Sequence, residues 1–296
     1  MGKIRDIYDR IAKRCISLSA KCTVHLINGL YGTEYSSESK VTYRWTENVD
    51  NELKRTLADT IITINDQHSY HIEFQMTKDG DIILRLFEYG FHYALSSHGR
   101  SDTLVFPEPM VVYLYDRENF PDEYRIHIQF GKKDAFVYSV PVFKYLKKSL
   151  EELEQKKLTI LLPFQLLRLR RTIEKERTQE NIEALKKLIR HDILDSINRN
   201  LDAGNITQTE AAKLAQLTLR LYHHIYQEYE ELEKEGVNQM AEEALILDVD
   251  ILEYKIKTLE GEKQVWKLKA QGNSMEKIAE QTGFSPAKVQ EILTAE

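Results

Sequence analysis

The sequence predicts an α/β fold in which a mixed β-sheet is followed by a helical C-terminal extension. Three observations support this class. Short runs with strand-like patterns occur between positions 60 and 141, and an amphipathic helix expected at 81–97 interrupts them. Five of the six prolines lie between 107 and 163. Beyond Pro163, apolar residues recur at intervals of three and four, as they do in helices.

Composition narrows the class of protein. The chain has 296 residues, 42% of them apolar, so it can bury a full core and contain more than one structural unit. It has no run of about 18 apolar residues, and its N-terminus is charged and lacks an apolar signal core. Cys15 and Cys22 are seven residues apart on one expected helical face, where we expect buried thiols and not a disulfide or a zinc pair. These features predict a cytoplasmic protein without a membrane association.

Acidic residues mark the first two expected strands. Asp59 opens the apolar run 60–64, and a turn separates this run from the alternating run 70–75, which places Glu73 and Gln75 on one face. If the runs pair as a hairpin, Asp59 and Gln75 come near the same open end of the sheet. Two carboxylates at a strand end suit Mg²⁺, which takes one or two protein carboxylates together with water and substrate phosphate. A hairpin with two acids on its solvent face is the plainer alternative, but an unpaired carboxylate in so apolar a strand is costly.

The helix expected at 81–97 follows this pair of strands directly. Arg85 lies one turn into it, and we expect its guanidinium to bind the acid cluster or a phosphate. Tyr89 lies one turn further on and is expected in the core. His71 shares the strand face of Glu73, where we expect a partly exposed strand residue and not a metal ligand.

These residues carry a resemblance to a known group of enzymes. The segments ADTII, YHIEFQ and ILRLFEYGFHYAL resemble the PD-(D/E)XK nuclease superfamily. Within it, the chain is most similar to the recombination-promoting nuclease and putative transposase family, in which Glu-x-Gln replaces Glu-x-Lys. The resemblance covers most of residues 1–170, including ISLSAKCTVHLINGLYG and KKLTILLPFQLLRLRR. The sequence contains no GxxxxGK[ST] or GxGxxG loop, no HExxH helix and no CxxC pair.

The resemblance implies a DNA endonuclease that depends on Mg²⁺ or Mn²⁺. By position, Asp59 matches the metal-binding aspartate, Glu73 the second acid and Gln75 the third motif residue. The backbone carbonyl of Phe74 would also face the metal. Such folds usually take a further acid from the first helix, and the candidates are Asp6 and Asp9, with Glu47 and Glu52 as alternatives. We retain Asp9 in the predicted ligand set.

Gln75 stands where the superfamily usually has lysine. A glutamine can orient a water through its amide and carbonyl, but it supplies no positive charge. A neighbouring cation would have to compensate, and the candidates are Arg85 and Lys78. We assign Arg85 to the catalytic set together with Asp59, Glu73 and Gln75.

The charge distribution is uneven. A net charge of −6 is unusual for a nucleic-acid enzyme, because affinity for DNA comes mainly from cations that meet phosphates. A basic cluster contains Arg168, Arg170, Arg171, Lys175 and Arg177. It could contact DNA, but glutamates interleave with it, so we interpret it as a solvated helix face.

The C-terminal half divides at glycines. Helices are expected near 178–201, 207–235 and 237–260, with breaks at Gly204, Gly236 and Gly261 and with Thr207 as an N-cap. Residues 262–296 resemble a helix-turn-helix, with a reading helix from Ser285 to Leu293 and a small core of Ile278, Ala279, Phe284 and Val289. Packing or dimerisation is the alternative role for this unit.

We therefore predict a nuclease-like domain at 1–160, a helical region at 161–261 and a helix-turn-helix-like unit at 262–296. The expected function is Mg²⁺- or Mn²⁺-dependent DNA cleavage in a transposition- or recombination-related role. DNA is the expected partner, and a homo-oligomer is a second possible assembly. Two alternatives stay open: an inactive nuclease-fold protein that binds DNA or another protein, and a regulator that binds DNA through 262–296.

Overall fold

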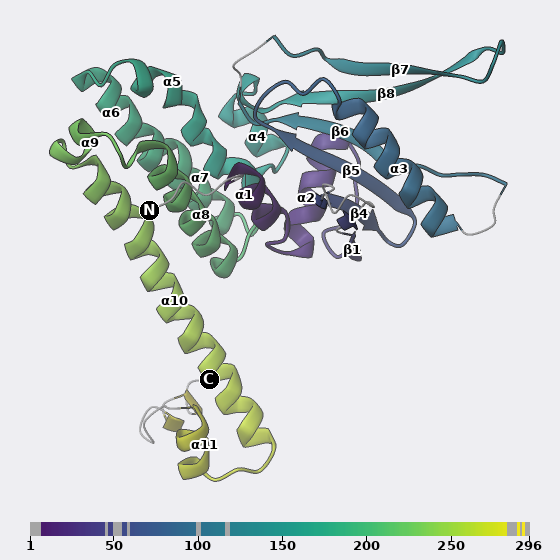
Figure 1. Cartoon of the computed structure of the whole chain (residues 1–296). Helices are drawn as coiled ribbons and strands as arrows, with labels where there is room; N and C mark the ends of the chain where they lie inside the picture. Colours follow the sequence, from purple (N-terminus) through teal and green to yellow (C-terminus); the bar gives the residue numbers. More distant parts are fainter. Residues whose placement is uncertain are drawn as a thin grey trace.

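The computed structural model describes residues 7–44, 47–49, 55–57, 60–98, 102–115, 119–282, 289–290 and 292–293. Its centre is a six-stranded sheet with the order β1-β4-β5-β6-β8-β7 (Figure 1). In that order the strands span Val41–Arg44, Thr60–Ile64, His68–Gln75, Glu108–Tyr113, Ala135–Lys144 and Glu123–Gln129. Strands β5, β6 and β8 run parallel, whereas the other neighbours are antiparallel. A separate small sheet pairs β2 (Glu47–Val49) with β3 (Arg55–Leu57). The predicted α/β class with a mixed sheet is confirmed.

Helices cover both faces of the six-stranded sheet (Figure 1). The covering helices nearest the sheet are α1 (Ile7–Ile16), α2 (Ala20–Tyr31) and α3 (Ile82–His98). Ile72 and Phe74 of β5 pack into one large core with α1, α2 and the C-terminal helices. On the other face, Leu86 of α3 joins a smaller cluster with Val111 of β6. Strand alternation therefore separates two buried faces, one for the large core and one for α3.

A tight turn fixes the pairing of β4 with β5. Asn65 and Asp66 have φ values of 52° and 56°, so both central residues are left-handed. The N–H of Gln67 donates to the carbonyl of Ile64 at 3.1 Å, and Ile64 pairs with His68, so residues 65–67 form a three-residue hairpin loop. The resulting register places Thr60 opposite Ile72, and the predicted turn and hairpin are confirmed.

The chain beyond the sheet is almost wholly helical, as predicted. Its segments are η1 (Tyr145–Lys147), α4 (Leu150–Gln155), η2 (Thr159–Leu166), α5 (Leu167–Lys175), α6 (Gln179–Lys187), the π-helical η3 (Leu188–Leu194), α7 (Asp195–Asp202), α8 (Gln208–Tyr226), α9 (Glu230–Lys234), α10 (Val237–Ala270) and α11 (Met275–Thr282). Within the described part of the chain, none of these helices combines the length and the apolarity needed to cross a bilayer.

The predicted helix breaks are right at two glycines and wrong at the third. Gly204 and Gly236 have φ values of 67°, which favours glycine because it has no Cβ. Thr207 caps α8 as predicted, and Glu210 completes a capping box. Gly261 breaks nothing, because α10 continues through it to Ala270. A single glycine costs a helix only about 1 kcal/mol, which the rest of a long helix can offset.

The buried residues of the C-terminal half belong to two separate hydrophobic clusters. The large core draws residues from α1 through to Leu245 of α10. The far end of α10 and the segment after it form a second, separate cluster that includes Val265, Ile278 and Val289. In Figure 1, α10 extends away from the body of the molecule, and α11 packs against its distal end.

The two cysteines occupy different helices, which corrects the expectation of one shared helical face. Cys15 lies in α1 and Cys22 in α2, because the chain leaves the first helix at Ser17 and restarts at the N-cap Ser19. Both thiols are free and buried, as expected. Burial raises the pKa of Cys22 to about 11 and raises that of Cys15 further, so both thiols stay protonated at neutral pH.

Candidate functional site

The candidate site lies on the face of β5 that α3 covers. Alternation along the strand directs His71, Glu73 and Gln75 toward this face, while Ile72 and Phe74 point into the large core. Glu73 is only 3% exposed, although it is a carboxylate. Charged groups are rarely buried to this extent without a partner, so its contacts decide what the site can do.

A hydrogen-bonded network holds the Glu73 carboxylate. Arg85 Nη2 donates to Glu73 Oε1 at 2.9 Å, and Gln75 Nε2 donates to the same oxygen at 2.8 Å. Arg85 Nη1 donates to Asp79 Oδ2 at 2.5 Å, and Asp79 Oδ1 accepts from the Asp81 N–H at 2.9 Å. Both donors to Glu73 use Oε1, so Oε2 takes part in neither bond. Arg85 therefore binds the acid cluster, as the sequence predicts.

The pKa values in this network are set by the Arg85 guanidinium, which pairs with the carboxyl groups of both Glu73 and Asp79. Burial alone would lower the pKa of Arg85, but the hydrogen bonds and charges of Asp79 and Glu73 outweigh it and raise that pKa. Burial likewise acts to raise the pKa of Asp79, yet hydrogen bonds from the Asp81 N–H and Arg85 hold it below its usual value. Asp79 and Arg85 thus stay charged at neutral pH.

Asp79 is a member of the site that sequence reasoning missed. It precedes Arg85 by six residues, in the segment TKDGD. An Asp-Gly pair usually indicates only a turn, since aspartate bonds to the backbone two residues on. Asp79 does so through Oδ1, and its second oxygen then meets Arg85. The sequence therefore indicated the turn at Asp79, but it did not indicate that Asp79 also orients Arg85.

His71 is the second surprise. Its side chain is fully buried beside Tyr89, with ring centroids 6.2 Å apart, and neither ring nitrogen has a hydrogen-bond partner. The expectation of a partly exposed strand residue is wrong, because α3 closes over this face. Burial lowers the pKa of His71 to about 4, although the nearby Glu73 charge acts in the opposite direction. The ring is therefore neutral at pH 7.

Further along the same face, polar contacts continue between the hairpin and α3. The Thr63 and Ser69 hydroxyls lie 2.9 Å apart, and the Tyr93 hydroxyl lies 2.7 Å from that of Ser69. Tyr89 is 5% exposed and buried as predicted. The α3 face of the hairpin is thus polar over much of its length, although α3 covers it.

Several predicted ligands lie outside the described residues. They are Asp59, Asp6 and Glu52, and the side chain of Glu47 is not described either. Asp9 is described in α1, where its carboxylate pairs with Lys13 at 2.9 Å. The Phe74 side chain is buried in the large core. Across the residues that the structure does describe, no three His, Cys, Asp or Glu side chains form a metal-binding group.

Three arginines of the basic cluster at 168–177 make contacts that hold the fold together. Arg168 donates to the carbonyl of Lys148 at 2.5 Å, and Arg170 donates to the Tyr8 hydroxyl at 2.7 Å. Arg177 donates to backbone carbonyls at the end of α5. These three arginines are therefore half-buried structural residues, which corrects the expectation of a solvated face for them, whereas Arg171 and Lys175 of the same cluster are exposed as predicted.

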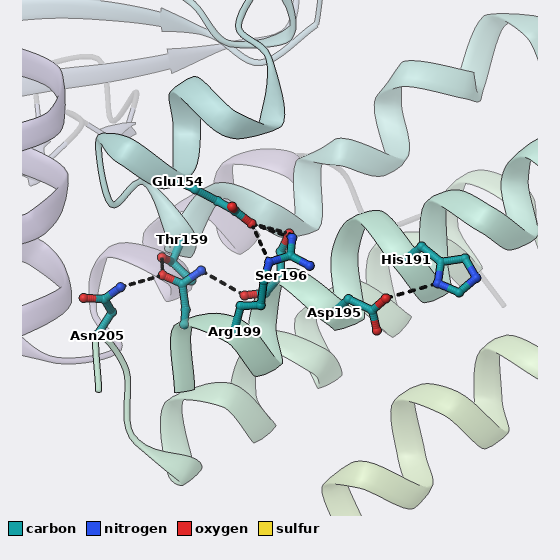
Figure 2. Close-up of polar contacts among 8 residues, drawn as sticks. Glu154, Thr159, His191, Asp195, Ser196, Arg199 and Asn205 are labelled. Carbon is teal, nitrogen blue, oxygen red and sulfur yellow. Dashed lines mark hydrogen bonds and ion pairs between the residues drawn. The ribbon is translucent and has the colours of Figure 1, made fainter. Parts of the chain in front are cut away.

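A second polar cluster, in the helical part, contains a serine, a histidine and acids (Figure 2). The Ser196 hydroxyl donates to Glu154 at 2.8 Å and accepts from Arg199 at 2.7 Å. His191 instead pairs with Asp195 at 3.1 Å, both on the exposed side of the helix. The serine and the histidine thus belong to separate contacts, so this cluster fastens α7 to α4 and does not form a nucleophile–base pair.

The C-terminal unit has part of its expected core. Ile278 and Ala279 of α11 are buried against Val265 and Leu268 of α10, together with Val289. Phe284 and Ser285 lie outside the described residues. The assignment of a reading helix from Ser285 therefore stays a prediction.

The chemistry of the described donors fits a divalent ion. Glu73 keeps Oε2 outside the hydrogen bonds from Gln75 and Arg85, and His71 offers two unpartnered nitrogens on the same face. Carboxylate and imidazole are both common ligands of divalent ions. A scan against protein-family models, a search of curated proteins and a search of solved structures found no match to this chain.

Proposed function

We propose that this chain is a metal-dependent endonuclease that hydrolyses phosphodiester bonds in DNA, on a PD-(D/E)XK-type core with a transposition- or recombination-related role. The observation that carries the proposal is the buried Glu73, held by Gln75 and Arg85 beneath α3. The sequence places Asp59 directly before Thr60, whose strand partner Ile72 directly precedes Glu73. This placement supports the pairing of Asp59 with Glu73 that the resemblance implies.

Each residue has a separate role in this mechanism. Asp59 and Glu73 would hold Mg²⁺ or Mn²⁺, with the Phe74 carbonyl and Asp9 as further ligands. When bound, such an ion polarises the scissile phosphate and lowers the pKa of a coordinated water. Gln75 would orient the attacking water through its carbonyl and amide groups, while its Nε2 also donates to Glu73. Arg85, fixed by Asp79, places a cation where negative charge develops on the phosphate, and it thereby replaces the lysine that the motif lacks.

One observation favours a second candidate, an inactive nuclease fold that binds DNA or a partner. The two donors on Glu73 Oε1 already satisfy part of the carboxylate, and Arg85 supplies a positive charge without any metal. A buried acid that is paired in this way can persist for structural reasons alone. The two candidates differ in whether the site binds a divalent ion and cuts.

Nicking of supercoiled plasmid DNA tests the proposal. We expect cleavage with Mg²⁺ or Mn²⁺ and none with excess chelator. Asp59→Ala and Glu73→Gln should both abolish it while circular dichroism shows a folded protein. Asp66→Asn is the matched control, because Asp66 is an acid of the same hairpin that is exposed and pairs with Lys40.

The outcomes separate the candidates. Wild-type cleavage by a folded Asp59→Ala protein would contradict the proposed site. DNA binding that is unchanged by metal, in a wild-type protein that never cuts, would instead support the inactive fold. Filter binding in parallel with the nicking assay measures both quantities on the same preparations.

A further inference from the structure

The buried ring of His71 lacks any partner for either nitrogen. Buried polar side chains in native proteins almost always have a hydrogen bond, and leaving one unpaired costs about 1–3 kcal/mol. An apolar side chain would fill the same space without this cost. The ring is therefore out of place as a purely structural residue, and a missing partner at this position is the simplest explanation.

The neighbours of His71 indicate what that partner is. His71 and Glu73 are two positions apart on one strand, so their side chains leave the same face about 6.6 Å apart. Tyr89 of α3 borders the ring on the helix side. An imidazole nitrogen and a carboxylate oxygen each lie about 2.0–2.2 Å from a shared ion such as zinc. Two side chains with this separation on one strand face can therefore reach a single ion placed between them.

Glu73 is prepared for such an arrangement. Gln75 and Arg85 both bind Oε1, which fixes the carboxylate and leaves Oε2 outside these bonds. Asp79 draws the other branch of the Arg85 guanidinium away from Glu73. One guanidinium thus pairs with two carboxylates, so the three side chains together carry a net negative charge. This charge favours the binding of a cation beside Glu73.

We propose that a ring nitrogen of His71 is a ligand of the divalent ion held at Glu73, and that this ligand makes the site favour Mn²⁺ over Mg²⁺. The inference rests on the proposed function, since it adds a ligand to the same site. Imidazole suits transition-metal ions, whereas Mg²⁺ prefers oxygen ligands and keeps much of its water. A nitrogen ligand therefore raises the affinity for Mn²⁺ more than that for Mg²⁺.

Metal binding to the full-length, chelator-treated protein tests the inference without any assay of cleavage. Calorimetry should give tighter binding of Mn²⁺ than of Mg²⁺. In His71→Gln the Mn²⁺ affinity should fall by about tenfold or more, since even outer partners of metal ligands contribute 10–100-fold. The Mg²⁺ affinity should change by less than about threefold, because its oxygen ligands remain. His68→Gln is the matched control, as His68 lies on the same strand but is exposed.

Pulsed electron paramagnetic resonance adds a direct signature. Bound Mn²⁺ should show coupling to an imidazole nitrogen in the wild-type protein and in His68→Gln, and should lose it in His71→Gln. His71→Leu, which removes the nitrogens and fills the position with an apolar side chain, provides a second variant if His71→Gln fails to fold.

These measurements distinguish failure of the His71 ligand from failure of the proposed nuclease site. Mn²⁺ that binds wild-type protein without nitrogen coupling, and equally well in both His71 variants, overturns the role of His71 but leaves the proposed nuclease site intact. A wild-type protein that binds neither ion overturns both. If Glu73→Gln abolishes binding while the His71 variants match wild type, the ion sits on oxygen ligands alone and the inference fails.

Discussion

The two faces of β5 are both buried, but they differ in chemistry. On one face, Ile72 and Phe74 join a large apolar core with α1 and α2. On the other, the polar side chains of His71 and Glu73 are buried under α3, which also forms a smaller apolar cluster with Val111. A single strand thus carries an ordinary hydrophobic face and a polar face that would normally be solvated.

The difference between the faces lies in how their burial affects the stability of the fold. Burying apolar surface is favourable by about 25 cal/mol per Å². Burying an unpaired imidazole or a carboxylate is unfavourable unless partners compensate. The α3 face supplies partners for Glu73 but none for His71. Polar residues that persist in such a place are typical of a functional site, where stability is given up for reactivity.

The largest expected effect on the fold lies on the apolar face. Ile72 is fully buried in the centre of the large core, so Ile72→Ala removes packing partners and leaves a cavity. The free energy of unfolding should fall by about 2–5 kcal/mol. Urea denaturation followed by circular dichroism measures it. A loss below about 1 kcal/mol would mean that this face is much less tightly packed than the structure indicates.

The second prediction concerns the rate of DNA cleavage and a residue on the polar face of β5. Gln75→Leu removes both hydrogen-bonding groups while keeping a similar volume, so cleavage should slow by about ten- to a thousandfold. Gln75→Lys restores a cation and should be tolerated. DNA binding should change much less, because contacts elsewhere set affinity. If Gln75→Leu cuts as fast as the parent, Gln75 only braces Glu73 through its 2.8 Å bond.

A substitution on the polar face of β5 should change stability in the opposite direction from Ile72→Ala, and by less. His71→Leu replaces an unpartnered buried ring by an apolar side chain, so the metal-free protein should gain about 1–2 kcal/mol of stability. Excess Mn²⁺ should then stabilise the wild type more than the variant, because a ligand that binds only the folded state adds stability in proportion to the logarithm of its affinity. Thermal unfolding with and without Mn²⁺ measures both. A destabilised metal-free variant would show that His71 contributes packing that Leu cannot supply.

Local patterns predicted much of this architecture. The alternation from Tyr70 to Gln75 and the turn before it were sufficient to place Glu73 and Gln75 on one face. The helical period from 81 to 97 predicted a helix and a buried Tyr89. Such features depend on neighbours within a few residues, so the sequence contains the information needed to predict them.

Features set by long-range packing were not predictable in the same way. Whether a strand face is exposed depends on which helix later covers it, so the burial of His71 could not be read from β5 alone. Arg168 and Arg170 look like solvated cations in sequence, yet their partners Lys148 and Tyr8 come from distant segments. The role of Asp59 remains a prediction, since it lies outside the described residues.

The smallest expected effect on the fold comes from the C-terminal unit, whose cluster is separate from the large core. Deleting 262–296 should leave the unfolding of the body nearly unchanged, because Leu245 is the last residue of the large core among the described side chains. The deleted segment contains five lysines and five glutamates, so the net charge stays at −6. Any change in DNA binding then reflects the local interactions of this unit. If the unit binds phosphates, the slope of log affinity against log salt should flatten by about 0.9 for each phosphate that it neutralises. An unchanged slope, with a change in oligomeric state by light scattering, would instead assign the unit to dimerisation.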